Sequence, residues 1–382
     1  MGVHLSSQQQ FQLERIQSFI SGSLSRKDCA LLLNLSERTI SRLAAAVQAE
    51  GLAAILHGNK GKVPINKSSA EIKSLSHQLA TSKYYDFNIL HMHEKLQSEI
   101  DLKICYSTFR KWCHEWQLVK RTRKQKRSNN GHQYRQRHHC EGFMLQMDGS
   151  EHMYWKGETT VLIAAIDDAT SDVPYGAFYK SEDTINCLDV LEKIIKIKGI
   201  PKYIYTDKAG WLAGTKRQEF TQFTRACEEL GIEVISANSA QAKGRIERLW
   251  GYLQDRLTVE MRLAGISNIE DANIFFNHYM QTEWKLKHTV KPVNTESAYR
   301  NIPIDFDFNE IFCLKYSRRV SLDHTISWKG EKYLIKNQPM NLAKKDIEIR
   351  FYKDQTSKVY YAGRALQLEK VHRPSRHGLL AA

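Results

Sequence analysis

Residues 240–257 read AQAKGRIERLWGYLQDRL and are typical of an amphipathic helix. At 100° per residue, one side of this helix gathers the apolar side chains of Ile246, Leu249, Trp250, Leu253 and Leu257. Glu247 falls just beside this apolar face, so we expect its carboxylate at the rim, where it could be buried at one edge. A pairing with Lys243 at i, i+4 would explain a solitary acid there. A role in a shared acidic site requires partners elsewhere in the chain.

The composition indicates a folded protein with a polyanionic partner. The chain has 382 residues, of which 42% are hydrophobic and 26% charged, enough for two to four domains. Lys and Arg number 56 against 42 Asp and Glu, a net charge of +14. This excess favours nucleic acid first and an anionic membrane surface second. No run approaches the roughly 18 apolar residues of a spanning helix. We therefore expect a cytoplasmic protein without membrane contact.

The cysteines argue against a disulfide framework and against a structural zinc module. There are seven of them, an odd number, scattered along the chain and never in a CxxC pair. We expect reduced thiols that act as small apolar side chains.

Residues 25–51, SRKDCALLLNLSERTISRLAAAVQAEG, predict two helices joined by a tight turn. Ser25 and Ser36 are suited to cap the two helices, and Asn34 can adopt the left-handed conformation of the turn. The layout matches a helix-turn-helix, although a plain helical hairpin has the same pattern. If the second helix reads DNA, the residues that face outward on it are Arg38, Thr39 and Arg42.

A second helical group, at about 69–117, repeats this plan with Ser107 as the expected N-cap of its last helix. Its aromatic stripe of Phe109, Trp112 and Trp116 favours a core over a base-stacking surface. Arg110 and Lys111 are its candidate DNA contacts. The segment 120–139 then holds eight Lys or Arg and no acid, so it is a solvated linker or a phosphate-binding arm. Its candidate contacts are Arg121, Arg123, Lys124, Lys126 and Arg127.

After residue 140 the periodicity predicts strand, strand, strand, helix, strand, helix, strand, helix. Five strands in this order indicate a mixed sheet with helices on its faces. From about 317 the pattern returns to strands broken by Gly and Asp, as in a small β-barrel. The chain is therefore expected to be multidomain, with all-α units at 1–60 and 61–119, a basic linker at 120–139, an α/β domain at 140–290, and a linker with a β-barrel at 291–382.

Three acids can meet at one edge of the predicted sheet. Asp148 lies near the end of the first strand, Asp207 follows the apolar run YIY of the fourth, and Glu247 lies on the flanking helix. Such a trio can hold two divalent cations about 3.5–4 Å apart for phosphodiester chemistry. Nearby positive charges would steer the DNA backbone to these metals, from Lys243, Arg245 and Arg248. The rivals for metal binding are Asp167 and Asp168, which are better suited to cap a turn or to face solvent.

The chain resembles the DDE transposases in three features. These are the spacings of the acids, 207 − 148 = 59 and 247 − 207 = 40, the order of the strands, and the sequence of the helix that carries Glu247. The resemblance is strongest to the ISNCY group of bacterial insertion sequences. The matching segments are Gln241 to Arg248, Leu253 to Leu257, Glu260 to Ile266 and Ala272 to Phe275. Two positions depart from the pattern: Ala240 stands where proline is usual, and Trp250–Gly251 replaces a more polar pair.

The resemblance implies an RNase H-like core in which Asp148, Asp207 and Glu247 are catalytic and bind two Mg²⁺ ions, for which Mn²⁺ can substitute. It implies helical units that bind terminal inverted repeats, 3′-end cleavage, and strand transfer into target DNA. It further implies a homo-oligomer assembled on DNA, in the bacterial cytoplasm with the nucleoid. A sequence-specific regulator with an inactive core is the alternative, and an RNase H-type nuclease is the third hypothesis.

Overall fold

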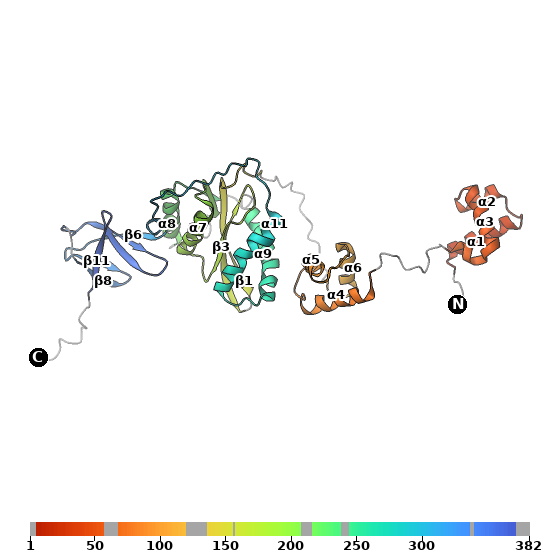
Figure 1. Ribbon diagram of the computed structural model, residues 1–382, viewed down its shortest axis with the longest axis horizontal. Coiled ribbons are helices and arrows are strands. Elements are labelled where there is room, and N and C mark those ends of the chain that lie inside the picture. Colours follow the sequence, from red (N-terminus) through yellow and green to blue (C-terminus); the bar gives the residue numbers. More distant parts are fainter. Residues whose placement is uncertain are drawn as a thin grey trace, which may run out of the picture. The chain divides into compact units, whose positions relative to one another are not determined.

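The computed structural model describes residues 5–56, 68–119, 136–155, 157–207, 216–237, 244–336 and 340–371 (Figure 1). Within these ranges, the side chains of residues 207, 216–221, 236 and 237 are not described. The chain divides into two compact units, Met1–Leu75 and Ser76–Ala382. No helix in the described ranges is long and apolar enough to cross a membrane.

The first unit contains the helices α1 (Ser7–Ile20), α2 (Arg26–Leu33) and α3 (Glu37–Glu50), followed by the short η1 (Gly51–Ile55). Both predicted caps are confirmed, because Ser25 Oγ accepts the backbone N–H of Asp28 at 3.1 Å and Ser36 Oγ that of Thr39 at 3.2 Å. Asn34 ends α2 at φ 53°, in the predicted left-handed turn. Ile40 is fully buried between the helices.

The second helical group consists of α4 (Ala70–Ser82), α5 (Ile89–Ile100) and α6 (Tyr106–Glu115). The predicted cap at Ser107 is wrong, because α6 begins earlier and Cys105 holds the N-cap position. Ser107 lies in the first turn, where its hydroxyl contacts the Cys105 sulfur at 3.1 Å. Phe109 and Trp112 are buried in the core of this group, as the aromatic stripe predicts.

No disulfide joins the seven cysteines, all of which lie in the described ranges, and five of them are buried. Cys105 is exposed, and hydrogen bonds from the Ser107 and Thr108 hydroxyls lower the pKa of its thiol to about 7. An ordinary thiol has a pKa of about 8.5, so at pH 7 far more of Cys105 is the reactive thiolate.

We expect Cys105 to be alkylated several-fold faster than Cys140 when the native chain is treated with iodoacetamide at pH 7 and analysed by mass spectrometry. Ser107→Ala removes the main hydrogen bond and should move the midpoint of the pH–rate curve upward. Equal rates at Cys105 and Cys140, or a midpoint that Ser107→Ala leaves in place, would contradict this assignment.

The predicted mixed sheet of five strands is confirmed. Its strands are β1 (Met144–Trp155), β2 (Glu158–Asp167), β3 (Gly176–Tyr179), β4 (Tyr203–Asp207) and β5 (Glu233–Ala237). They lie in the order β3-β2-β1-β4-β5, with β1, β2 and β3 antiparallel and with β4 and β5 parallel to β1. This arrangement fits an RNase H-like core.

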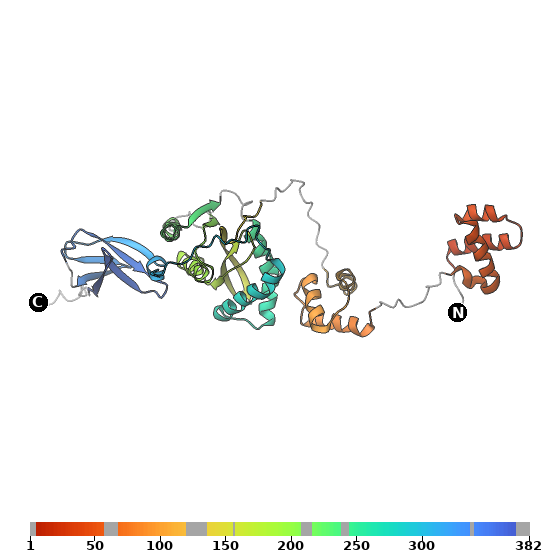
Figure 2. The same cartoon turned by 45° about the horizontal axis from the view of Figure 1, so that its top comes forward.

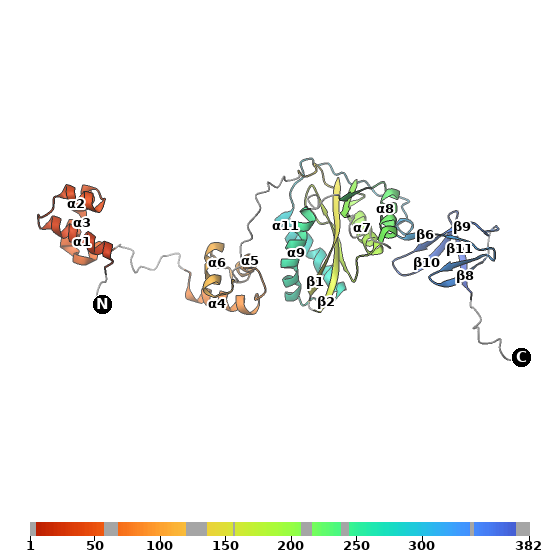
Figure 3. The same ribbon diagram turned by 180° about the vertical axis from the view of Figure 1, so that it is seen from behind.

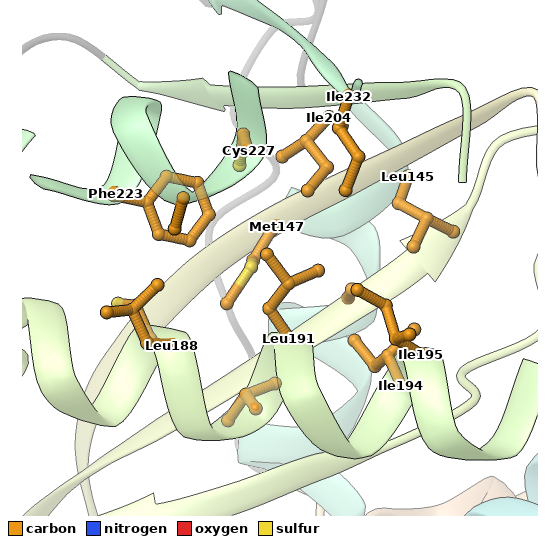
Figure 4. Packing of buried hydrophobic residues seen from close by; sticks show 14 of the residues in the cluster. Leu145, Met147, Leu188, Leu191, Ile194, Ile195, Ile204, Phe223, Cys227 and Ile232 are labelled. Carbon is orange, nitrogen blue, oxygen red and sulfur yellow. The ribbon is translucent and has the colours of Figure 1, made fainter. Parts of the chain in front are cut away.

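Helices cover both faces of this sheet (Figures 1 and 3). One face packs against α7 (Thr184–Lys198) and α8 (Lys216–Glu229), where Leu145 and Met147 of β1 meet Leu191 and Phe223 (Figure 4). The other face packs against α9 (Gly244–Leu263) and α10 (Ile269–Tyr279). The chain continues from α10 through the π-helical η3 (Met280–Trp284) and α11 (Lys285–His288). Because side chains of a strand alternate between faces, the even-numbered residues of β1 point toward α9.

The C-terminal strands form a six-stranded antiparallel sheet in the order β6-β9-β10-β11-β8-β7. These strands are drawn in blue in Figure 2. They are β6 (Leu314–Arg319), β7 (Thr325–Trp328), β8 (Glu331–Lys336), β9 (Asp346–Phe351), β10 (Ser357–Tyr361) and β11 (Arg364–Lys370), preceded by the short α12 (Phe308–Ile311). The two edge strands, β6 and β7, contact each other, so the sheet is barrel-like as predicted.

Candidate active site

Asp148 and Asp207 lie on two neighbouring parallel strands, each two residues beyond the last paired positions, Gln146 and Tyr205. Leu145 pairs with Ile204 and the pairing continues to Gln146, so the numbers of paired positions differ by 204 − 145 = 59. The same difference relates Asp148 to Asp207, since 207 − 148 = 59. Continued by two residues beyond the paired segment, this register would place Asp148 level with Asp207.

The position of Asp148 along its strand differs from the prediction. Asp148 does not lie near the end of β1, because that strand continues to Trp155 in a long antiparallel pairing with β2. The parallel neighbour β4, in contrast, ends at Asp207. Of these two acids, only Asp207 therefore lies at a strand end.

Three regularly spaced side-chain hydrogen bonds hold helix α9 on β1. Every second residue of β1 bonds every fourth residue of α9: Gln146 Oε1 accepts Ile246 N–H at 3.3 Å, Asp148 Oδ2 accepts Trp250 Nε1–H at 3.3 Å, and Ser150 Oγ accepts from Gln254 Nε2 at 3.0 Å. Two strand residues span about 6.7 Å and four helical residues about 6 Å, so the contacts stay in step. This series fixes the register of α9 against the strand of Asp148.

Glu247 lies in the first turn of α9, between two of these contacts, which are made by Ile246 and Trp250. The apolar face predicted for this helix is confirmed, because the five side chains that define it are buried. Glu247 itself is exposed beside this face, so it is not buried at one edge, which a rim position would have allowed. The reason is its angle of about 100° from Ile246, which turns it out of the packed face. An acid in the first turn is stabilised by the helix dipole.

The donor set fits a hard divalent cation in its chemistry, because carboxylate oxygens are the ligands that Mg²⁺ takes in proteins. Among the side chains that the structure describes, no three His, Cys, Asp or Glu lie close enough together to hold a metal. The Asp207 side chain lies outside that set.

Asp167 caps a turn, as the sequence suggested. Its Oδ1 accepts the backbone N–H of Ala169 at 3.0 Å and of Thr170 at 2.8 Å, and its Oδ2 accepts Gly142 N–H at 2.8 Å. Burial raises the pKa of Asp167, and these hydrogen bonds oppose that rise.

Asp168 is fully buried and paired with Arg245, whose Nε donates to Asp168 Oδ1 at 2.8 Å. Gln146 Nε2 donates to the same oxygen at 2.9 Å, and the His138 backbone N–H donates to Oδ2 at 3.1 Å. The Arg245 side chain is 12% exposed. Of the predicted DNA contacts, Arg245 is therefore turned inward to tie the start of α9 to the end of β2. The sequence does not show this pairing or the roles of Gln146 and Trp250, because their spacing carries no local signal.

The remaining predicted DNA contacts divide by exposure. The exposed ones are Arg38, Arg42, Arg110, Lys111 and Arg248. Thr39 is half-buried, and its hydroxyl lies 2.8 Å from that of Ser36. The others lie outside the described residues: Arg121, Arg123, Lys124, Lys126, Arg127 and Lys243.

Two curated proteins are similar to nearly the whole chain, although no family model matches it. A candidate transposase of Sinorhizobium fredii (strain NBRC 101917 / NGR234), y4bF, is 30% identical over 377 residues, which cover 96% of this chain and 82% of that protein. The transposase for insertion sequence IS1202 of Streptococcus pneumoniae is 31% identical over 358 residues, covering 84% and 76%.

The solved structures matched to part or most of this chain include viral integrases. The HTLV-2 integrase catalytic core domain in complex with magnesium, in its dimeric form, is 16% identical and covers 37% of this chain and 86% of that one, with a TM-score of 0.30. A chain of the simian T-cell lymphotropic virus intasome in complex with PP2A regulatory subunit B56 gamma is 15% identical and covers 78% and 99%, with a TM-score of 0.35.

Proposed function

Since the chain belongs to the transposases of insertion sequences, we propose that it binds the terminal inverted repeats of its element, cleaves their 3′ ends and joins them to target DNA. The observation that supports this proposal is the match between the register of the paired strands and the spacing of the two acids. Glu247 lies on α9, the helix whose Trp250 contacts Asp148.

Asp148, Asp207 and Glu247 would hold two Mg²⁺ ions, which when bound activate the attacking oxygen and stabilise the leaving one. Water attacks the phosphorus at the 3′ end of the element, and the bond from phosphorus to the 3′ oxygen breaks. The freed 3′-hydroxyl then attacks a phosphorus of the target strand, whose own 3′ oxygen leaves. The exposed Arg248, next to Glu247 in the chain, attracts the DNA backbone to these acids.

The two helical groups read or hold the element's ends, with α3 as the proposed recognition helix of the first. Two DNA ends must be held together for joining, so we propose a homo-oligomer that assembles on DNA. The net charge of +14 supports contact with both the ends and the target.

The test is incubation of the full chain with labelled end DNA, target plasmid and Mg²⁺, scored for nicked and joined products. Nicked ends and joined products support the transposase. Specific binding without cutting in Mg²⁺ or Mn²⁺ would favour the regulator with an inactive core. Cleavage of RNA in a hybrid without joining would favour the RNase H-type nuclease.

Arg38→Ala should weaken binding to terminal repeats about 5- to 150-fold, because a side chain that contacts a base edge is worth about 1–3 kcal/mol. Arg38 is exposed near the start of α3, where a recognition helix meets base edges. Gel-shift affinities for repeat DNA and for random DNA of equal length measure the ratio.

The matched control is Lys27→Ala, which removes an exposed positive charge from α2 of the same unit. We expect Lys27→Ala to weaken binding to repeat DNA and to random DNA by a similar small factor. An equal loss on both DNAs for Arg38→Ala would mean that Arg38 contacts only phosphate.

A further inference from the structure

The indole N–H of Trp250 donates a hydrogen bond to the carboxylate of Asp148. Nε1 lies 3.3 Å from Oδ2, and the residue is 8% exposed. An indole N–H can only donate a hydrogen bond, and a buried one needs an acceptor. The two residues are 102 positions apart in the chain, so this contact exists only because α9 packs on β1.

The ring of Trp250 is held in place by its surroundings. It belongs to a core cluster with Ile246, Leu249 and Leu253 of its own helix and with apolar side chains of β2 and β3. The contacts of α9 with Gln146 and Ser150, on either side of Asp148, fix the helix along the strand. The donor that meets Asp148 therefore has little freedom to move.

From this geometry we infer that Trp250 is a positioning residue, which orients the Asp148 carboxylate for the divalent cation. The inference rests on the proposed function. Hydrogen bonds from neighbouring residues to a ligating carboxylate fix its orientation, and their loss commonly costs 10–100-fold in metal affinity or activity. A neutral donor suits this task, because it orients the carboxylate and leaves its negative charge intact. A Lys or Arg at the same place would neutralise part of that charge.

The experiment compares Trp250→Phe with Tyr252→Phe in the full chain. Trp250→Phe keeps an aromatic ring in the core and removes the donor to Asp148. Tyr252→Phe removes a hydroxyl two residues along the same helix, which lies 3.1 Å from the Tyr279 hydroxyl. Mn²⁺ affinity is measured by calorimetry without DNA, and the half-saturating Mg²⁺ concentration is measured in the cleavage assay. The melting temperature of each variant shows whether the substitution destabilises the fold.

We expect Trp250→Phe to weaken Mn²⁺ binding and to raise the half-saturating Mg²⁺ concentration about 10–100-fold. Tyr252→Phe should leave both values as in the wild type. If Trp250→Phe lowers the melting temperature strongly, Trp250→His is used as well, because it retains a ring with an N–H donor and should recover part of the affinity. Wild-type values for Trp250→Phe, or equal losses in the two Phe variants, would overturn the inference.

The outcome also separates this inference from the proposed function. If the wild type cleaves end DNA and Trp250→Phe keeps its metal affinity, only the role of Trp250 fails. If the wild type neither binds Mn²⁺ nor cleaves DNA, the metal site itself fails, and both proposals fall.

Discussion

Asp148→Asn should lower Mg²⁺-dependent cleavage of end DNA by at least about 10³-fold, while binding of the ends stays close to that of the wild type. A metal-dependent site loses several kcal/mol of transition-state stabilisation when a charged ligand is removed, and each loss of about 1.4 kcal/mol is a factor of ten in rate. Asparagine keeps the shape of the side chain and an oxygen that can accept the Trp250 N–H, so packing of α9 on β1 should survive. Single-turnover cleavage rates and gel-shift affinities, measured on the same preparation, separate the two effects.

Glu151→Gln is the matched control. It removes one negative charge from the same strand, β1, at an exposed residue. The alternation of side chains along a strand turns residue 151 away from the face that carries Asp148. We expect near-normal cleavage from this variant. Cleavage by Asp148→Asn at the wild-type rate would remove the proposed mechanism, and equal losses in the two variants would reduce the effect to general electrostatics.

Asp168→Ala should destabilise the α/β domain by about 3–5 kcal/mol, the usual effect of removing one partner of a buried ion pair. The change leaves the guanidinium of Arg245 without its buried carboxylate and also removes the acceptor of Gln146 Nε2. Hydrogen exchange of backbone amides in β1 and α9 measures this loss locally, which suits a chain with several domains.

The double variant Asp168→Ala/Arg245→Met tests the reason for that loss. Removing both charges should recover much of the stability, because most of the penalty comes from the buried charge left behind. Asp323→Ala is a contrasting control, since Asp323 pairs with Lys332 at 2.7 Å on the exposed surface and should change stability little. A loss for Asp168→Ala no larger than that for Asp323→Ala would contradict a structural role for the Asp168–Arg245 pair.

Local patterns explain how much of the fold could be predicted. The order of strands and helices in the α/β domain follows from side-chain periodicity, which is a property of neighbouring residues. The caps at Ser25 and Ser36 and the turn at Asn34 follow for the same reason. Ser107 shows the limit, because a serine can cap a helix only if the helix begins after it, and here α6 starts earlier.

The candidate site was only partly predictable. The spacing between Asp148 and Asp207 is visible in the sequence, but its agreement with the register of the parallel pairing is not. Parallel strands pair across a long connection, so no short window contains that information. The position of Glu247 beside the apolar face follows from helical periodicity, but whether the sheet covers it there does not, and the structure leaves it exposed.

The sequence by itself determined the identity of the elements, the apolar face of α9, the turn at Asp167 and the positive charge of the chain. Only the tertiary structure decided the partners: Arg245 meets Asp168 across 77 residues, and Trp250 meets Asp148 across 102. Helical periodicity says which way a side chain points from its own helix. The partner of that side chain depends on which strand packs against the helix, and this packing is determined by contacts between residues far apart in the chain.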